Sequence, residues 1–535
     1  MNTLIINARL VDGMGNPWFR GELLIGGDRI AAIGAPGQLS RTGAQIIDAQ
    51  DLILTPGFID IQSHSIVPLM KDGRCIGKVT QGVTTEIMGE LWTPAPFGGL
   101  IESPFRENLF PPPNEAWVHL AKTWTRFGHW LAHMEQTGVS VNIGSLIPGG
   151  TLREYACGFK TGPANAAELE IQRRVLAECM EDGAFGIDYA LIYPPDDFVP
   201  TDEIIELCKV CARYGGIYVT HMRSEGDRIE QALEETFRIA REAKIAAEIY
   251  HLKATGPRNW HKMAWVIAEV DKARRAGLDI TANMYPYPAS GTGLDAMLPM
   301  WVHANGKYFA NLADPALRKR IRAGVLADDN DQAGITPDCV MPIGFRKDNL
   351  KPYNGKMLDE IARERGQDWV DCMLDLLLEQ HANVATMYFG MHEDNLSMQI
   401  RQPWVKVSSD AGGHDPATAE TPTHPRSYGT FTRVLRKFVR EQGDITLESA
   451  IQKMTGAVAA RLGLHERGRL LPGLFADLTL FNPDTVADRA TFTDTHQTST
   501  GIHGVWVNGV RILEDGIHTG ARPGRFVKGS GATQP

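Results

Sequence analysis

Five polar residues that could bind a metal ion or move a proton each follow an apolar, strand-like run. They are His64, Glu90, His221, His251 and Asp410. A single histidine at a strand end is most often a hydrogen-bonded structural residue. Three histidines and two carboxylates facing one pocket would be costly to bury without compensation. Imidazole nitrogens and carboxylate oxygens are ligands of Zn²⁺, so this set predicts a zinc site.

Three further residues could hold a substrate beside such a site. Lys253 follows His251 by two positions, so on a strand the two side chains would share a face. Arg426, in the stretch His424 to Phe431, offers a guanidinium that suits a substrate carboxylate. Tyr285 follows another strand-like run, and its phenol could donate to a carbonyl or an oxyanion. Their alternative roles are surface charge for the two cations and wall packing for the tyrosine.

The elements that must position these residues alternate between strand and helix. Between about 55 and 465, short β-branched runs such as 216–220 and 405–409 are separated by helical stretches such as 166–183 and 229–244. This alternation predicts a parallel sheet, and about eight units predict a closed (β/α)8 barrel of the TIM type. In such a barrel, residues at the carboxyl ends of the strands meet at one mouth, where active sites are assembled.

The two chain ends have a different pattern. Residues 1–54 and 466–527 both contain short strands separated by Gly, Asp and Asn turns, so we expect them to form one small β-sandwich domain. The barrel domain is then residues 55–465. A stretch at about 295–355 interrupts its rhythm, and we interpret this stretch as a lid insertion or a surface excursion. Residues 528–535 are expected to be a disordered tail.

Composition narrows the class of protein. The chain has 535 residues, of which 43% are hydrophobic and 22% charged, and its formal net charge is −10. The acidic balance argues against a nucleic-acid or anionic-membrane partner, since both require a basic face. No signal peptide and no membrane span are recognisable, and the seven cysteines do not form a disulfide framework. We therefore expect a cytoplasmic enzyme with a small-molecule substrate.

The motifs also resemble a known family. In chain order they are PGFID with His64, GVTT, THMRSEG, HLK, MYPY, SSD, HPRSYGTF and PGLFADL. This order, over nearly the whole chain, resembles the D-aminoacylase (N-acyl-D-amino-acid deacylase) branch of the amidohydrolase superfamily. The resemblance implies a barrel with a small β-sandwich, and zinc-dependent hydrolysis of the amide bond of an N-acyl amino acid, D-configured in that branch.

The resemblance also implies roles for individual residues. His221 and His251 match tightly held metal ligands, and Asp410 matches the catalytic aspartate. Lys253, Tyr285 and Arg426 match residues that hold the carboxylate and the carbonyl of the substrate.

Three departures from the family pattern bear on the metal and the substrate. Gln62 stands where the first histidine of a His-x-His pair is expected, so we predict one tightly bound zinc ion, a second site that is weak or absent, and His64 as a weaker ligand. No cysteine follows the GVTT strand, and Glu90 is the nearest replacement, with Glu86 as its competitor. The family's GHG turn is replaced by residues 147–153, which leaves the substrate open.

The sequence therefore predicts a metal-assisted hydrolase in which Asp410 serves as base and then as acid. Hydrolysis of a different amide, a cyclic amide or a small peptide is the alternative. A homologue that binds a metal without catalysis is a third reading, against which the presence of Asp410 speaks.

Overall fold

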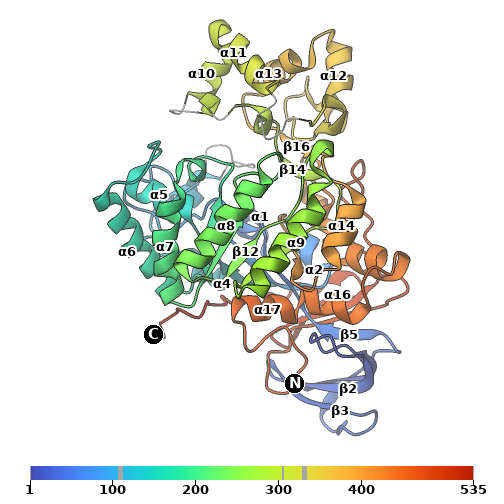
Figure 1. The fold of residues 1–535 in the computed structure, drawn as a ribbon. Coiled ribbons are helices and arrows are strands. Elements are labelled where there is room, and N and C mark those ends of the chain that lie inside the picture. Colours follow the sequence, from blue (N-terminus) through green and yellow to red (C-terminus); the bar gives the residue numbers. More distant parts are fainter. Residues whose placement is uncertain (1, 106–112, 300, 304–306, 328–333, 534–535) are drawn as a thin grey trace.

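A barrel of parallel strands forms the centre of the protein (Figure 1). The structure is a computed structural model that describes residues 2–105, 113–299, 301–303, 307–327 and 334–533. The barrel positions are taken in order by β6 (Phe58–Asp60), β7 (Val83–Met88), β8 (Asn142–Ser145) with β9 (Ile147–Pro148), β10 (Gly186–Ala190), β11 (Ile217–His221), β12 (Ala247–Ile249), β13 (Ile280–Met284) and β17 (Val405–Val407). Neighbouring strands pair in parallel, as the alternating sequence pattern predicts.

Two connections close the barrel. On one side, β8 pairs with β7 and β9 pairs with β10, so that one run of chain bridges the two sheets. On the other side, the Asp410 backbone N–H donates to Gln62 O at 3.0 Å, and Ser63 forms an isolated parallel β-bridge with Ala411. The first and last strands of the barrel therefore meet, and the predicted (β/α)8 fold is confirmed.

Helices cover the outer face of the barrel. Those that follow its strands are α6 (Ala166–Asp182), α7 (Thr201–Arg213), α8 (Ile229–Ala243), α9 (Lys262–Arg275), α14 (Glu393–Ile400), α16 (Leu447–Met454) and α17 (Gly456–Leu462). Shorter helices are α1 (Ile66–Lys71), α2 (Ile76–Val79), α3 (Glu115–Ala121), α4 (Gly128–Thr137), α5 (Gly149–Cys157) and α15 (Arg426–Arg433). In α8, Ile229, Leu233 and Phe237 recur every four residues and are buried against the barrel.

Strands from both chain ends share one sheet of nine strands, at the bottom of Figure 1. They are β1 (Asn2–Leu10), β2 (Phe19–Gly26), β3 (Arg29–Gly34), β4 (Ala44–Asp48), β5 (Ile53–Pro56), β18 (Leu478–Phe481), β19 (Ile502–Val507), β20 (Val510–Glu514) and β21 (Ile517–His518). The strand β5 joins the halves, because it pairs with both β1 and β18. Leu54, Leu478 and Trp506 lie in the core of this unit.

The insertion forms a lobe at the top of Figure 1. It contains β14 (Ser290–Gly293), α10 (Tyr308–Ala313), α11 (Pro315–Val325), β15 (Val340–Pro342), α12 (Leu358–Arg365), α13 (Trp369–Gln380) and β16 (Ala385–Tyr388). It has its own apolar core, which includes Val340, Leu358 and Leu377. The lobe continues beyond the expected 295–355, because β16 returns to pair with both β14 and β15.

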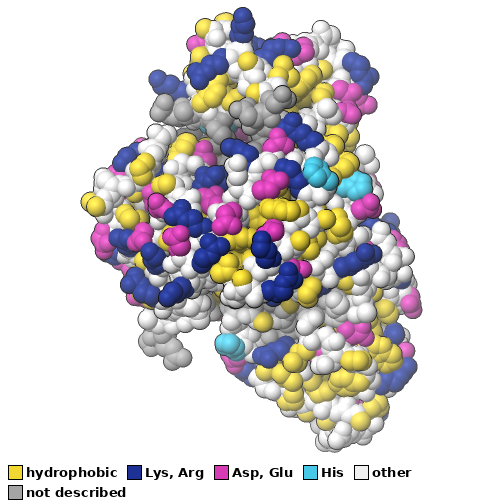
Figure 2. Space-filling view, viewed as in Figure 1, with side chains coloured by type: hydrophobic (Ala, Val, Ile, Leu, Met, Phe, Trp, Pro, Cys, Tyr) yellow, Lys and Arg dark blue, Asp and Glu magenta, His cyan; other side chains and the backbone are white. Residues whose placement is uncertain are grey.

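The end of the chain also differs from expectation. Residues 528–533, expected as a disordered tail, lie against the barrel: Gly529 N–H donates to Gly183 O at 2.9 Å and Ser530 Oγ to Gly215 O at 3.1 Å. Backbone groups need no hydrophobic pattern to make these bonds, so no residue pattern predicts them. Among the described helices, none is both long and apolar enough to cross a membrane. Acidic and basic side chains are interspersed on the face in Figure 2.

Candidate metal and active site

The predicted site residues lie at the carboxyl ends of the barrel strands. His221 is the last residue of β11, and His251 and Glu90 each follow the end of a strand by two residues. Both His251 and Asp410 have positive φ values, 33° and 50°, which turn their side chains out of the strand direction. The side chain of Asn283 supports the turn at His251 by accepting its backbone N–H at 2.8 Å.

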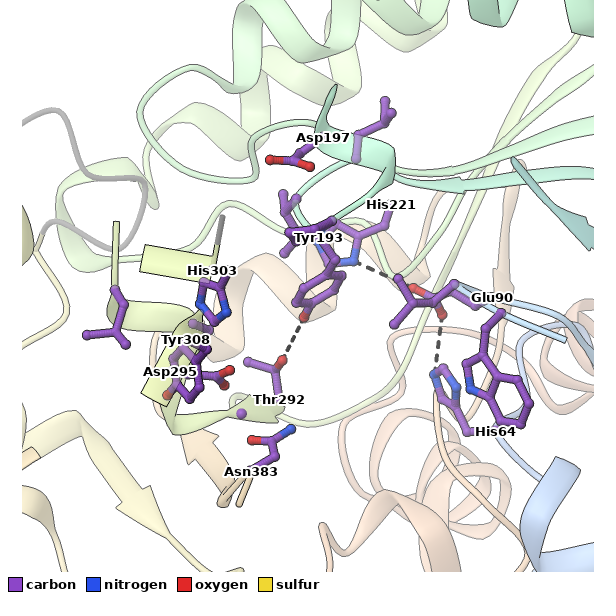
Figure 3. Close-up of a pocket in the computed structure, with 18 of the residues that line it drawn as sticks. His64, Glu90, Tyr193, Asp197, His221, Thr292, Asp295, His303, Tyr308 and Asn383 are labelled. Atoms are coloured by element: carbon purple, nitrogen blue, oxygen red, sulfur yellow. Dashed lines mark hydrogen bonds and ion pairs between the residues drawn. The ribbon is translucent and has the colours of Figure 1, made fainter. Parts of the chain in front are cut away.

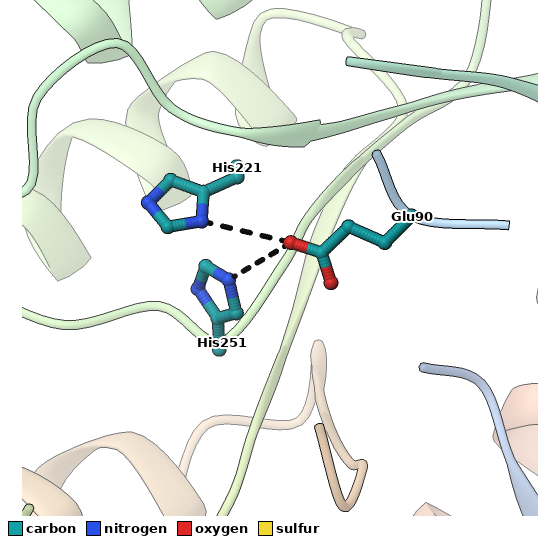
Figure 4. Close-up of side chains that lie close together, drawn as sticks. All are labelled: Glu90, His221 and His251. Carbon is teal, nitrogen blue, oxygen red and sulfur yellow. Dashed lines mark ion pairs between the residues drawn. The ribbon is translucent and has the colours of Figure 1, made fainter. Parts of the chain in front are cut away.

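Glu90, His221 and His251 form a three-donor group (Figure 4). Glu90 Oε1 lies 3.6 Å from His221 Nδ1 and 3.5 Å from His251 Nε2, and one donor atom from each residue lies within 4.8 Å of the others. All three side chains are buried. One carboxylate and two imidazoles at this spacing are a donor set that fits Zn²⁺.

Glu225 holds the far side of both histidines. Its carboxylate lies 3.3 Å from His221 Nε2 and 3.0 Å from His251 Nδ1, and it accepts a hydrogen bond from Lys253 Nζ at 2.5 Å. Ligating histidines are commonly oriented in this way by a carboxylate on their second nitrogen. The contact fixes which imidazole nitrogen faces Glu90, and so it supports the fit to a metal ion.

A second group joins His64, Glu90 and Asp410. His64 Nε2 lies 2.9 Å from Asp410 Oδ1 and 3.3 Å from Glu90 Oε2. Gln62 donates from Nε2 to the same two carboxylates, at 2.6 Å to Glu90 and 3.2 Å to Asp410. Its amide nitrogen therefore lies between the two acids, in the position where the family pattern has a histidine.

Negative charge dominates this part of the pocket. His64 is partly exposed, and although partial desolvation disfavours its protonation, hydrogen bonds to Asp410 and Glu90 raise its pKa to about 10. Burial and Lys253 oppose protonation of His251, but Glu225 and Asp410 raise its pKa to about 9. Burial also opposes ionisation of Glu90, and hydrogen bonds from His221 and His251 hold its pKa well below the ordinary value. The carboxylates that favour protonation of His64 and His251 also favour a metal cation at this position.

Arg426 pairs with the predicted catalytic aspartate. Its NH1 lies 2.6 Å from Asp410 Oδ2, and both side chains are buried. Burial would raise the pKa of Asp410, but Arg426, His251 and His64 lower it to about 2. Arg426 Nε is also buried, and it has no hydrogen-bond partner among the residues that the structure describes. That donor suits an anionic ligand.

Tyr285 and Lys253 complete the predicted set. The Arg426 guanidinium lies 4.6 Å from the centre of the Tyr285 ring, and the Tyr285 hydroxyl contacts Met391 Sδ at 3.7 Å. A thioether is a weak acceptor, so the hydroxyl remains able to donate to a ligand. Burial raises the pKa of Tyr285 well above its ordinary value and keeps it protonated. Lys253 is held between Glu225 and His251 Nδ1, at 2.5 and 2.7 Å.

Glu86, the competitor of Glu90, belongs to a separate buried network. It pairs with Lys78 Nζ at 2.8 Å and accepts hydrogen bonds from Ser63 and Ser65 at 3.0 Å. Lys78 also binds Asp60 at 2.7 Å, and all three charged groups are fully buried. The structure thus places Glu90, and not Glu86, beside the histidines.

A large cavity opens above these residues and extends to the inserted lobe (Figure 3). Its volume is about 1770 Å³. Tyr193 and Thr292 share a hydrogen bond of 2.6 Å between the two parts. Figure 3 shows Glu90, His221 and His64 on one side of this pair, and Asp295, His303 and Tyr308 of the lobe on the other.

Three residues that contribute to the site were not predicted: Glu225, Tyr193 and Asp188. Asp188 of β10 is fully buried and accepts the Leu91 backbone N–H at 3.0 Å, which supports the turn directly after Glu90. Tyr193 lies beside His221, with ring centres 5.7 Å apart. For Glu225, its spacing of four from His221 in the THMRSEG motif was an available signal. Asp188 and Tyr193 carry no comparable signal, because each is one polar residue in an otherwise ordinary run.

Comparison with known proteins assigns the family. Residues 45–513 match the model of the amidohydrolase family, which is most of the chain and includes every site residue described above. The chain belongs to the amidohydrolase family. Membership confirms the resemblance seen in the motifs.

Characterised relatives within this amidohydrolase family cover nearly the full chain. The chain is 34% identical to D-aminoacylase of Alcaligenes xylosoxydans xylosoxydans over 98% of its length and 97% of the relative. It is equally identical to N-acyl-D-aspartate deacylase of the same organism, over 98% and 94%. The solved structure of N-acyl-D-glutamate deacylase from Bordetella bronchiseptica, with zinc and a phosphonate inhibitor, matches with a TM-score of 0.80 at 29% identity, over 98% and 99% of the chains.

Proposed function

We propose that this amidohydrolase hydrolyses the amide bond of N-acyl-D-amino acids. The observation that carries the proposal is the Asp410–Arg426 ion pair placed next to the Glu90, His221 and His251 donor group. The pair sets a proton-transfer group and a carboxylate-binding group on one side of a candidate metal position. The D-aminoacylase and deacylase relatives, similar over nearly the whole chain, support this choice of substrate.

One zinc ion is held by Glu90, His221 and His251 in this proposal, with His64 as a weaker contributor. Zinc there supplies Lewis-acid polarisation of the scissile carbonyl and lowers the pKa of water. A second tightly held metal is disfavoured, because the Gln62 amide occupies the space between Glu90 and Asp410 and already donates to both. A neutral amide is also a poor ligand for zinc.

Asp410 moves the proton. Because Arg426 and His64 stabilise its charged form, it is ready at neutral pH to accept a proton from the attacking water. It then passes that proton to the leaving amine. The buried Tyr285 hydroxyl donates to the oxygen that gains negative charge, and its high pKa keeps the donor in place.

Arg426 and Lys253 bind the substrate carboxylate. Arg426 Nε is the buried donor that lacks a partner among the described residues, and its guanidinium can bind a carboxylate through two nitrogens. Lys253 adds positive charge on the side of His251. The two cations fix the position of the substrate carboxylate, and the site fixes the position of its carbonyl. With both held, only one configuration at Cα places the side chain where there is room, which supports selection between D and L substrates.

Activity assays on zinc-loaded protein test the proposal. N-acetyl-D-amino acids should be hydrolysed, and their L-isomers should be turned over more slowly by about a hundredfold or more. Turnover of lactams, hydantoins or small peptides without turnover of N-acyl-D-amino acids would assign another amide. No turnover on the whole panel would indicate a metal-binding homologue without catalysis.

Metal analysis by mass spectrometry tests the ligand set separately. We expect about one zinc per chain in the wild-type protein and loss of zinc in Glu90→Ala, since this change removes the only carboxylate of the donor group. Glu86→Gln is the matched control and should retain zinc if it folds. Gln62→His should increase the occupancy of a second metal. Two tightly held metals in the wild type would contradict the assignment.

A further inference from the structure

The chain that follows Glu90 forms an apolar wall of the cavity. Trp92 is two residues from Glu90, and its backbone N–H donates to Glu90 O at 2.9 Å. The indole packs against Phe105 with ring centres 5.8 Å apart. The apolar side chains that line this wall are Trp92, Pro94, Pro96, Phe97, Ile101 and Phe105, and Thr93, Glu102 and Ser103 of the same segment also line the cavity. We call the apolar set the aromatic wall.

The aromatic wall continues to an apolar rim on the surface. Phe159, just after α5, lines the same cavity with 61% of its surface exposed. Leu100 is 59% exposed, and its backbone N–H donates to Tyr155 O of α5 at 2.9 Å, which joins the wall segment to that helix. Exposed large apolar side chains that adjoin an apolar cavity wall are typical of a ligand-binding surface.

A series of neighbouring residues runs from Arg426 to the aromatic wall. Arg426 contacts Asp410, His64 lies between Asp410 and Glu90, and Trp92 follows Glu90 in the chain. With a carboxylate at Arg426 and a scissile carbonyl near Glu90, the acyl group of the proposed substrate would extend toward Trp92. The amino-acid end lies at the opposite side, where Arg426 NH2 donates to Gly291 O of β14 at 3.3 Å.

The cavity is also larger than a short acyl group requires. Its volume of about 1770 Å³ exceeds the usual range for small-molecule sites, about 300–1000 Å³. An acetyl group would fill only a small part of that volume and would leave most of the wall and the rim in contact with water. A long hydrocarbon chain would cover both.

We propose that the aromatic wall and rim bind a long, straight-chain acyl group, so that the preferred substrates are N-acyl-D-amino acids with fatty acyl chains. This inference rests on the proposed function and specifies its substrate class. Rigid aromatic rings that pack edge to face bind such a chain at little entropic cost, since few rotatable bonds become fixed in the protein. The polar residues of the inserted lobe, including Asp295 and His303, are left to face the amino-acid side chain.

A chain-length series tests the proposal. The kcat/KM values for N-acetyl-, N-octanoyl- and N-lauroyl-D-leucine should rise with chain length, by about tenfold or more from acetyl to octanoyl and mainly through KM. Values that stay level or fall along the series would overturn the inference. If no member of the series is hydrolysed by zinc-loaded enzyme, the proposed function itself fails, so the two failures are distinguishable.

Variants locate the effect on the wall and rim. Trp92→Ala and Phe159→Ser should each lower the octanoyl-to-acetyl ratio of kcat/KM severalfold. Phe159 is a surface residue, so its variant remains informative if Trp92→Ala fails to fold. Ile517→Ser changes another exposed apolar residue, on β21 and 74% exposed, and as the control it should leave the ratio unchanged. An unchanged ratio in Phe159→Ser, or a change only in oligomeric mass, would assign the rim to another role and overturn the inference.

Discussion

At the residue scale, one carboxylate organises much of the site. Glu225 contacts both predicted histidine ligands and Lys253, without belonging to the three-donor group. Burial opposes its ionisation, but His221, Lys253 and His251 hold its pKa well below the ordinary value. It therefore remains charged and fixes the histidine rings.

Replacing Glu225 should weaken zinc binding although none of the three candidate zinc ligands is removed. In Glu225→Gln we expect zinc affinity to fall by about 10- to 100-fold, because the rings lose their orienting charge. Competition with a chromogenic chelator measures this. Asp227→Asn is the control, because Asp227 pairs with Arg258 nearby. Equal zinc affinity in wild type and Glu225→Gln would contradict the role.

Asp410→Asn should separate metal binding from proton transfer. The amide cannot accept the proton of the attacking water, so kcat should fall by about 10² to 10⁴ or more while zinc content is retained. Steady-state kinetics and metal analysis on the same sample provide the measurement. Asp415→Asn, which changes an aspartate paired with Arg74, should keep most of the activity. Near wild-type activity in Asp410→Asn would exclude Asp410 as the base.

Residue identity was predictable where a motif ends a strand, and less so elsewhere. All eight predicted side chains line one cavity, because seven lie at or shortly after the ends of barrel strands and Arg426 begins α15 in the segment after the last strand. The sequence favoured Glu90 over Glu86 as the replacement for the missing cysteine, and in the structure Glu86 lies inside β7 and pairs with Lys78. Apart from the four-residue spacing from His221, the contacts of Glu225 with His221, His251 and Lys253 could not be derived from the sequence, because they depend on the path of the loop after β11.

At the element scale, the turn after β7 sets the position of Glu90, the candidate metal ligand. Gly89 has φ of 101°, and a Cβ atom there would lie 2.2 Å from Leu146 O. Gly89→Ala should therefore displace Glu90 and lower zinc affinity at least about tenfold. Gly473→Ala is a matched control, with φ of 89° and open space around the added atom. If both variants bind zinc as the wild type does, the turn does not position Glu90.

The contact between α16 and β17 should make stability depend on pH. Lys453 of α16 donates to Val405 O at 2.9 Å, and burial together with Lys406 lowers its pKa to about 7 from 10.5. Between these values the unfolded chain binds a proton that the folded chain does not, so stability should rise with pH from about 7 to 10.5.

Lys453→Met should flatten that rise. Between pH 7 and 9.5 the free energy of unfolding of the wild type should increase relative to that of the variant by on the order of 1 kcal/mol or more. Melting temperatures measured across this range report the change. Lys272→Met, at an exposed position of α9, is the control. If the melting temperatures of wild type and Lys453→Met changed equally with pH across this range, Lys453 would keep its charge when buried.

Helices and strands with a regular spacing of apolar residues were predictable from the sequence. The extent of the lobe was only partly predictable. The barrel helices and strands follow from apolar spacing alone. The lobe was expected to end near 355, but α12 and α13 have the same buried spacing as barrel helices. Their packing in the lobe core and the pairing of β16 with β14 and β15 assign them to the lobe, and these are long-range contacts that spacing does not specify.

At the scale of the whole molecule, the chain end fastens the barrel. Ile143 N–H of β8 donates to Arg525 O at 2.9 Å, and Val527 N–H donates to Ile143 O at 2.8 Å. Removal of residues 525–535 should lower the melting temperature by about 5 °C or more, because buried backbone groups of β8 lose their partners. Removal of residues 534–535 alone takes away none of these bonds and is the control. Equal melting temperatures would show that the chain end is dispensable.

The closure of the barrel has a consequence for how the enzyme is made. Gln62 and Asp410 touch across a separation of 348 residues, because the first strand of the barrel meets the last. On the ribosome, the nascent chain emerges with Gln62, His64 and Glu90 long before Asp410 and Arg426. Asp410, the proposed proton carrier, and its partner Arg426 are thus synthesised after the candidate metal ligands, and a chain interrupted before Arg426 lacks this ion pair. Under the proposed function, hydrolysis therefore requires synthesis to continue at least through Arg426.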